Sequence, residues 1–516
     1  MSFVSFNFLL FIFAVAVIYY AVPLKYRNYL ILPMNLVFYV TAGWEGLLWL
    51  MITAVVTWWM AVRIELRQTR YKQEKAEIRA GELDHQAIRE KEKLTKSRMT
   101  RTCRGYLAAG IVLVVGIWAF FKSGKGSIAV PLAISYYTFM AVSYLADVYS
   151  HQYKAEHNFY RYLTWLTFFP QMVEGPFSRY DKQSAELMSP HCFRSESFVR
   201  GMMRILWGYS KKLVLADYLW MMISGVFAQD GTNACQTLLL ILLLPLQQYA
   251  DFSGCMDIAL GTAGLIGIRL PENFRSPVFS KSVDEIWRRW HITLGAFCKD
   301  YIFYPVSLLK GLNLTTRKIF HRRPSVGKKI PAMIALLCVW TFMGLWHGFA
   351  WKYLIWGWTN LFFIAAGILL DPAYNKIEKQ IHIQTDSRGW KLWCMIRTYL
   401  IFGAMELISD GPSASYAGRM FLSLFHKSKW LLIRDQSGIT GLLPGISMPG
   451  TVAAVIISLF MLAVDILKEK QKDVFAILQD IPFIPRYLLY CMIFYMIVLF
   501  GPSAGNINAG FAYANF

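Results

Sequence analysis

The sequence predicts an all-α, polytopic integral membrane protein, and three observations lead to this class. Hydrophobic residues make up 56% of the 516 residues, and charged residues make up only 16%, against roughly 25% in an average soluble chain. Long apolar stretches alternate with short charged connections. The formal net charge is nevertheless +21. Nucleic-acid binders carry such charge on a soluble module, whereas membrane proteins collect it in their cytoplasmic loops, so we expect no nucleic-acid partner.

The first apolar stretches predict three spans. A bilayer-spanning helix needs about 20 mainly apolar residues, and residues 3–22 meet this requirement. The stretch exceeds the apolar core of a signal peptide, so we expect it to be retained. Lys25 and Arg27 follow it and indicate a cytoplasmic loop. The next apolar run, residues 29–62, is too long for one span, and Gly43 to Glu45 offer a break between two.

Residues 63–104 form the largest shift in composition. They hold 13 Lys or Arg and seven Asp or Glu, which places them in the cytoplasm by the positive-inside rule. Opposite charges four residues apart favour helix. The segment therefore predicts a solvated helical hairpin or an extended loop. The alternative is a docking surface for a cytoplasmic partner or for acidic lipid headgroups.

The rest of the chain supplies the remaining spans, for a total of roughly 11 to 13 hydrophobic helices. Residues 271–310 are amphipathic, which favours a re-entrant or interfacial arrangement. The predicted organisation is N-terminal spans in 1–62, a basic loop in 63–104, a core in 105–370 and C-terminal spans in 371–516. The further candidate spans are residues 105–121, 130–149, 162–173, 198–227, 237–250, 256–268, 332–349, 353–370, 392–407, 451–466 and 487–500.

The eight cysteines include no C-x-x-C pair. This spacing favours neither a zinc site nor a disulfide framework. We expect no metal site, and we interpret the cysteines as small apolar residues of helices.

Two histidines are the candidates for chemistry, because ionisable residues at membrane depth are costly and therefore functional by default. His347 lies between Trp340 and Trp351 in a stretch without formal charge, and His291 lies in Trp-Arg-Arg-Trp-His. A buried imidazole stays neutral and can act as a general base, although a structural, hydrogen-bonded role is the alternative. Gly344 and Gly348 would let a substrate or another helix approach. The chain has no nucleophile elbow, so the chemistry indicated is base-assisted attack by a hydroxyl of the substrate.

Four sequence blocks carry a resemblance to a known family. They are Pro-Leu-Ala-Ile-Ser-Tyr-Tyr-Thr-Phe with Ser-Tyr-Leu-Ala-Asp in 131–147, Phe-Phe-Pro-Gln with Gly-Pro in 168–176, Asp-Phe-Ser-Gly to Leu-Pro-Glu-Asn-Phe in 251–274, and the two histidine contexts in 287–348. In this order they resemble the bacterial branch of the membrane-bound O-acyltransferases. The resemblance implies helices around a funnel or tunnel, through which an acyl group from a cytoplasmic thioester reaches an outer hydroxyl.

The resemblance also implies roles for single residues. His347 matches the family's near-invariant histidine and is expected to accept the proton of the attacking hydroxyl. His291 matches the second polar residue of the catalytic region and is expected to orient or polarise the thioester, or to act as a second base. Trp346 is expected to contact the substrate.

The donor's phosphates are expected at Arg288 and Arg289, unless these side chains only extend to the cytoplasmic interface. Asp300 matches the carboxylate that follows in the family pattern. It is a candidate substrate-binding residue, and a structural salt bridge with one of the two arginines is the favoured interpretation. Lys299 stands where the pattern favours Arg, which leaves the details of donor recognition open. Asp251 and Asp257 are interpreted as helix-end or packing groups.

The ending at residues 510–516 resembles the alginate-acetylation type. It favours O-acetylation of an exported polysaccharide by a multi-pass protein of the bacterial plasma membrane, in contact with membrane lipid. The implied donor is acetyl-coenzyme A, a substrate rather than a bound cofactor, and the implied partner is an extracytoplasmic SGNH or esterase-like acetyltransferase. The alternatives are D-alanyl transfer to teichoic acid from a carrier-protein thioester, and a non-catalytic transporter or scaffold.

Overall fold

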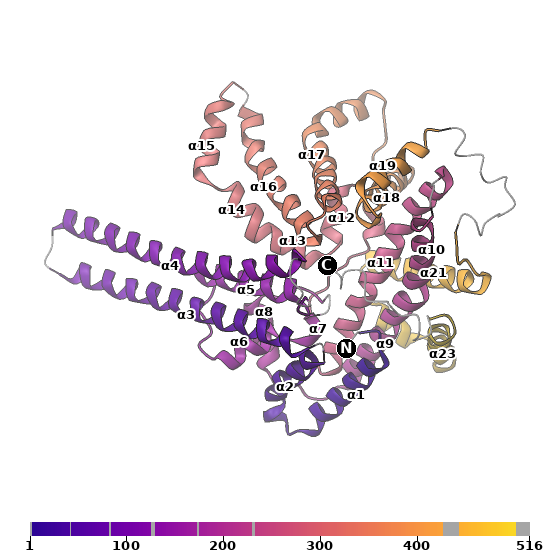
Figure 1. Ribbon diagram of the computed structural model, residues 1–516, viewed down its shortest axis with the longest axis horizontal. Coiled ribbons are helices and arrows are strands. Elements are labelled where there is room, and N and C mark those ends of the chain that lie inside the picture. The colour runs from indigo at the N-terminus through magenta and orange to yellow at the C-terminus, as the bar shows by residue number, and fades with distance from the viewer. Residues whose placement is uncertain are drawn as a thin grey trace. The chain divides into compact units, whose positions relative to one another are not determined.

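A computed structural model describes residues 3–41, 43–81, 84–124, 130–172, 175–229, 233–322, 324–426 and 443–501. The regular structure within these ranges is entirely helical (Figure 1), which confirms the all-α class. The chain divides into two compact units, Met1–Phe198 with Ala263–Leu270, and Val199–Thr262 with Pro271–Phe516. The four-part organisation expected from the sequence stays a prediction.

Eight helices of the described residues are long and apolar enough to cross a membrane, which confirms the polytopic class. Several other apolar segments form shorter helices, among them α1 (Phe6–Ala21) with 16 residues. The eight long helices are α3 (Trp44–Ala80), α4 (His85–Lys122), α11 (Ala234–Leu265), α16 (Pro324–His347), α17 (Trp351–Gln380), α18 (Arg388–Asp410), α21 (Met448–Glu469) and α23 (Phe483–Phe500).

The first unit begins with α1 and α2 (Arg27–Val40). Gly43 follows with φ +122°, a conformation that L side chains rarely adopt, and α3 starts at the next residue. The chain therefore breaks where the sequence predicts it, although α2, with 14 residues, is not among the eight helices long enough to span. The unit also contains α5 (Ile134–Tyr149), α6 (Phe159–Leu166), α7 (Phe169–Met172) and α8 (Tyr180–Met188).

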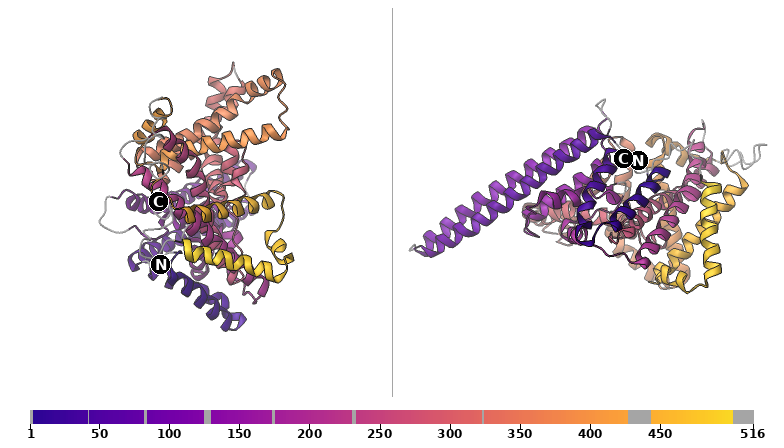
Figure 2. Two further views of the ribbon diagram at one scale, coloured as in Figure 1. Left: turned by 90° about the vertical axis from the view of Figure 1, so that its right-hand side faces the viewer. Right: turned by 90° about the horizontal axis from the view of Figure 1, so that it is seen from below.

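The basic segment 63–104 is the outer half of a helical hairpin formed by α3 and α4 (Figures 1 and 2). With 37 residues, α3 is about 55 Å long, well beyond the roughly 30 Å core of a bilayer. Asp84 caps α4, since its carboxylate accepts a hydrogen bond from the Ala87 amide at 2.7 Å. Arg79 pairs with Glu92 across the hairpin at 2.5 Å. Of the two predicted forms, the hairpin is the one observed.

The second unit begins with α9 (Ser195–Tyr209), the π-helical segment η2 (Ser210–Ala216) and α10 (Asp217–Phe227). These three elements follow one another without a gap. Gly208 permits close packing on α11, because a Cβ there would lie 2.6 Å from the Gly254 carbonyl oxygen. A buried apolar cluster joins η2 and α10 to α11 and α21 through residues such as Leu215, Leu244 and Ile457. The last helices are α21, α22 (Val474–Asp480) and α23, and residues 510–516 lie outside the described ranges.

Residues 271–310 form short elements instead of a span. They are η3 (Pro277–Phe279), α12 (Val283–Arg289), α13 (Ile292–Cys298), η4 (Lys299–Phe303) and α14 (Tyr304–Ser307), followed by α15 (Lys310–Ile319). Ser282 caps α12 by accepting a hydrogen bond from the Glu285 amide at 3.1 Å. His291 separates α12 from α13 with a left-handed φ of 45°. This left-handed residue ends one helix and turns the chain into the next.

Helices α16 and α17 form a tight hairpin. A Cβ on Gly344 would lie 2.7 Å from the Tyr353 carbonyl oxygen, and one on Gly348 would lie 2.7 Å from the Tyr353 ring. We expected these glycines to let either a substrate or another helix approach. In the structure, helix α17 occupies the space beside them. Helix α18 packs beside α17 and leads to α19 (Ala414–Ser423).

Candidate active site

Asn273 fixes the orientation of His291. The Asn273 side-chain oxygen accepts hydrogen bonds from the Thr293 amide and hydroxyl, both at 2.9 Å. Its Nδ2 therefore faces His291 and lies 3.0 Å from the ring Nδ1. The Asn273 carbonyl also accepts from the Ile292 amide at 3.0 Å. One asparagine thus holds the ring of His291 and the backbone of the two residues that follow it.

This contact assigns the tautomer of His291. An amide N–H can only donate, so Nδ1 accepts and the proton of the neutral ring sits on Nε2. Burial is the main cause that lowers the pKa of His291 to about 3, and the neighbouring His347 contributes. His291 is therefore neutral at physiological pH and offers Nε2–H as a hydrogen-bond donor.

His347 is the last residue of α16 and is buried among aromatic rings. The centroid of its ring lies 4.9 Å from that of Trp346 and 4.7 Å from that of Trp356. Trp346 is also 5.9 Å from the His291 ring. The structure thus brings together the three residues predicted from the two histidine contexts, with Trp346 in contact with both imidazoles.

A buried polar network lies behind Trp356. The Trp356 indole N–H donates to Glu406 at 3.1 Å. Gln248 donates to Glu406 at 3.0 Å and to Asp410 at 2.7 Å, and Ser409 donates to Asp410 at 3.1 Å. Sequence reasoning missed this network, although the rule applied to the histidines, that polar residues within an apolar span are candidates, also marks Glu406.

The two arginines before His291 have different surroundings. The Arg289 side chain is only 10% exposed and pairs with Glu285 at 2.8 Å and Glu469 at 2.6 Å. The Arg288 side chain is 67% exposed and pairs with Asp284 at 2.5 Å, within one helical turn. Arg288 is therefore accessible to a ligand, whereas Arg289 joins α12 to α21.

Asp300 lies in η4, after α13, and is partly exposed. The ion pairs that the structure gives for Arg288 and Arg289 lead to Asp284, Glu285 and Glu469. Lys299, beside Asp300, lies 5.6 Å from the Tyr304 ring centroid. The expected pairing of Asp300 with an arginine is not among these contacts.

The loop that carries Asn273 is tied to a network of ion pairs, buried at one end, that the sequence did not reveal. Arg204 contacts Glu272 with both terminal nitrogens, at 2.7 and 2.6 Å, and contacts Asp257 at 2.8 Å. Lys211 of η2 pairs with Asp257 at 2.6 Å. Because Glu272 directly precedes Asn273, these pairs hold the loop in place.

The second lysine of η2 makes a separate buried set. Lys212 pairs with Asp251 at 2.5 Å and with Asp217 at 2.8 Å. Asp251 and Asp257, both in α11, therefore pair with the buried lysines of η2. This role is more specific than the helix-end or packing role that we expected. All eight cysteines are free thiols. The described residues include no group of three or more His, Cys, Asp or Glu side chains that could hold a metal ion.

Several known proteins are similar to this chain in sequence. Residues 37–409 match the sequence profile of the membrane-bound O-acyltransferase family. The protein named Probable alginate O-acetylase AlgI of Pseudomonas aeruginosa is 26% identical over 452 residues, which cover 83% of this chain and 75% of that protein. Peptidoglycan O-acetyltransferase of Helicobacter pylori is 28% identical over 286 residues, 49% of each chain. Teichoic acid D-alanyltransferase of Streptococcus thermophilus is 26% identical over 276 residues, 52% of this chain and 63% of that protein.

Proposed function

This chain belongs to the membrane-bound O-acyltransferase family, and we propose that it moves an acetyl group from a cytoplasmic thioester across the membrane to a hydroxyl acceptor, for the O-acetylation of an exported polysaccharide. It is a multi-pass membrane O-acyltransferase. The observation that carries the proposed mechanism is the Asn273 contact, which leaves His291 with a proton on Nε2 beside Trp346 and His347.

The two histidines have complementary tasks in this mechanism. His347 accepts the proton of the acceptor hydroxyl while its oxygen attacks the thioester carbonyl carbon. His291 donates Nε2–H to the carbonyl oxygen as negative charge develops there. When the tetrahedral intermediate collapses, the carbon–sulfur bond breaks and the thiolate takes the proton from His347. The aromatic surroundings keep water away from the thioester.

Donor recognition rests on the accessible cation. We assign a donor phosphate to Arg288, because its guanidinium is exposed and its partner Asp284 is exposed too. Arg289 is engaged by two carboxylates and has the weaker claim. Trp346 lines the reacting centre. Asp300 stays a candidate for donor binding.

The names of the relatives support the proposed class of acceptor. Two of the matched proteins are named for O-acetylation of alginate and peptidoglycan, which favours an envelope polymer as acceptor. The donor is then acetyl-coenzyme A, the membrane is the bacterial plasma membrane, and an extracytoplasmic SGNH or esterase-like enzyme completes transfer to sugar. D-alanyl transfer from a carrier protein is the second candidate, supported by the teichoic acid relative.

Reconstituted vesicles with labelled acetyl-coenzyme A on the cytoplasmic face test the proposal. We expect label to reach an acceptor hydroxyl on the outer face, and His347→Ala to abolish this transfer while the protein folds. The matched control is His382→Ala, at an exposed histidine far along the chain. If His347→Ala retained transfer, the assignment of His347 as the general base would be refuted. Label accepted only from an aminoacylated carrier protein would establish the second candidate instead.

A further inference from the structure

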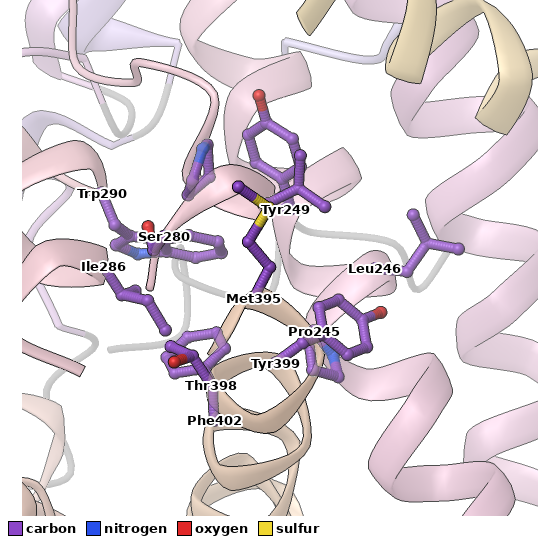
Figure 3. Close-up of a pocket in the computed structure, with 12 residues that line it drawn as sticks. Pro245, Leu246, Tyr249, Ser280, Ile286, Trp290, Met395, Thr398, Tyr399 and Phe402 are labelled. Atoms are coloured by element: carbon purple, nitrogen blue, oxygen red, sulfur yellow. The ribbon is translucent and has the colours of Figure 1, made fainter. Parts of the chain in front are cut away.

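A half-open apolar cavity lies beside the candidate active site, between α11, α18 and the loop around η3 (Figure 3). The space free of atoms is about 450 Å³, a figure that includes the open mouth of the cavity. Trp290, Ser280 and Ile286 lie on one side, Pro245 and Tyr399 lie on the other, and Met395 lies between them (Figure 3).

Two residues of the lining carry buried hydroxyls without a hydrogen-bond partner among the described residues. The side chains of Ser280 and Thr398 each belong to residues that are only 1% exposed. Buried polar groups in native proteins are almost always paired. Ser280 and Thr398 both line the same apolar cavity, so a ligand that brings a hydrogen-bonding atom to these two side chains would satisfy them.

Exposed apolar side chains lie on the two long helices that border the cavity. Both of its helices, α11 and α18, are long and apolar enough to cross the bilayer. Leu242 of α11 and Ile396 and Leu400 of α18 are exposed large apolar side chains close in sequence to lining residues. Exposed apolar surface on spanning helices faces hydrocarbon. The occupant therefore enters from the membrane and carries a hydrocarbon chain.

A cation follows or precedes each of the two hydroxyl residues. Lys281 follows Ser280, and Arg397 precedes Thr398. The Arg397 guanidinium donates to the Lys281 carbonyl oxygen at 2.8 Å, so it connects the loop to α18 at the edge of the cavity. Two cations beside two unpaired hydroxyls match a phosphate next to an ester.

We propose that this cavity binds one anionic glycerophospholipid. Its acyl chain fills the space around Met395, its ester carbonyl accepts hydrogen bonds from Ser280 and Thr398, and its phosphate lies near Lys281 and Arg397. Trp290 forms part of the inner wall and directly precedes His291. The bound chain therefore packs against the residue that leads into the catalytic region.

Photocrosslinking in nanodiscs tests this site on the full-length protein. The probe is phosphatidylglycerol with a diazirine near the end of one acyl chain, and labelled peptides are identified by mass spectrometry. We expect labels on Met395, Leu246 or Tyr399. The double variant Ser280→Ala with Thr398→Val should weaken retention about tenfold, as expected for two lost hydrogen bonds. Met395→Trp should abolish labelling by filling the cavity.

Matched controls use hydroxyls that are already paired within their own helices. Thr359 donates to the Ile355 carbonyl and Ser458 to the Ala454 carbonyl, both at 2.8 Å. The variant Thr359→Val with Ser458→Ala should retain the probe like the unmodified protein.

Three results would overturn the proposal. The first is labelling confined to outward residues such as Leu392, and the second is equal retention of phosphatidylcholine with the same chains. The third is displacement of the probe by acetyl-coenzyme A, which would make the cavity part of the donor path. None of these measurements depends on acyl transfer. The proposed lipid site can therefore be refuted while the proposed function stands, and the proposed function can be refuted while the lipid site stands.

Discussion

Replacing Asn273 by Asp should reverse the proton position on His291 while keeping the local structure. Asp is close to Asn in size and keeps the oxygen that accepts from the Thr293 amide and hydroxyl at 2.9 Å. The second oxygen would replace the N–H that lies 3.0 Å from Nδ1. A carboxylate only accepts hydrogen bonds, so the neutral ring would place its proton on Nδ1 and present a bare Nε2.

The size of the effect follows from the role of the lost donor. Removal of one oxyanion-stabilising donor lowers kcat by roughly 10²–10³, and we expect a loss in this range for Asn273→Asp. The new carboxylate also favours the imidazolium, which carries protons on both nitrogens. The variant's kcat should therefore recover as the pH falls and decrease as the pH rises. In the unmodified protein His291 keeps a pKa lowered to about 3 and contributes no such change near neutrality.

The assay is the initial rate of label transfer in vesicles between pH 6 and roughly pH 9, with thermal unfolding measured in parallel. Asn158→Asp is the matched control, because Asn158 caps α6 through its side-chain oxygen and Asp serves equally as a cap. An Asn273→Asp enzyme with unaltered kcat above neutral pH would refute the assigned tautomer and the donor role of His291.

Three further outcomes are expected. Because burial lowers the pKa of His291 to about 3, from an ordinary value of about 6.5, the unfolded chain binds the extra proton between these values. The free energy of unfolding should then fall as the pH drops from about 6.5 toward 3, and an equal decline in His291→Gln would exclude this cause. Gly344→Ala should destabilise the protein by about 1–3 kcal/mol, since its Cβ would meet the Tyr353 carbonyl oxygen at 2.7 Å; an unchanged unfolding temperature would contradict the packing argument. Lys212→Met should cost about 3–5 kcal/mol by removing the buried cation that pairs with Asp251 and Asp217, and denaturant midpoints that match the unmodified protein would show that these pairs are dispensable.

Much of the fold followed from the sequence because composition and charge act locally. The apolar runs, the break at Gly43 and the charge pattern of residues 63–104 each report on neighbouring residues, and helices with these properties are observed. The number of spans was predicted less well. The sequence predicted roughly 11 to 13 hydrophobic helices, and eight helices of the described residues meet the length and polarity requirements of a span. Stretches such as residues 130–149 are apolar enough to attract attention, yet the helix that forms there has 16 residues.

The candidate site divides in the same way. His347, His291 and Trp346 were recognised from their motifs, and they lie together. The sequence showed Asn273 only as part of a family motif and predicted no role for it, because its role depends on a contact with the His291 ring, 18 residues away. Glu406 was missed because its partner Gln248 lies 158 residues away. Arg288 and Arg289, adjacent and chemically identical, differ only in where α12 directs them.

The sequence by itself determined that this chain is a helical membrane protein with two histidines in an acyltransferase pattern, because hydropathy and motifs are properties of short stretches. Only the tertiary structure decided which nitrogen of His291 carries the proton and which arginine is accessible. It also decided that Asp257 neutralises Lys211 and that Asp251 neutralises Lys212. The physical reason is that a buried charge or imidazole takes its state from the groups around it, and folding brings those groups from distant parts of the chain.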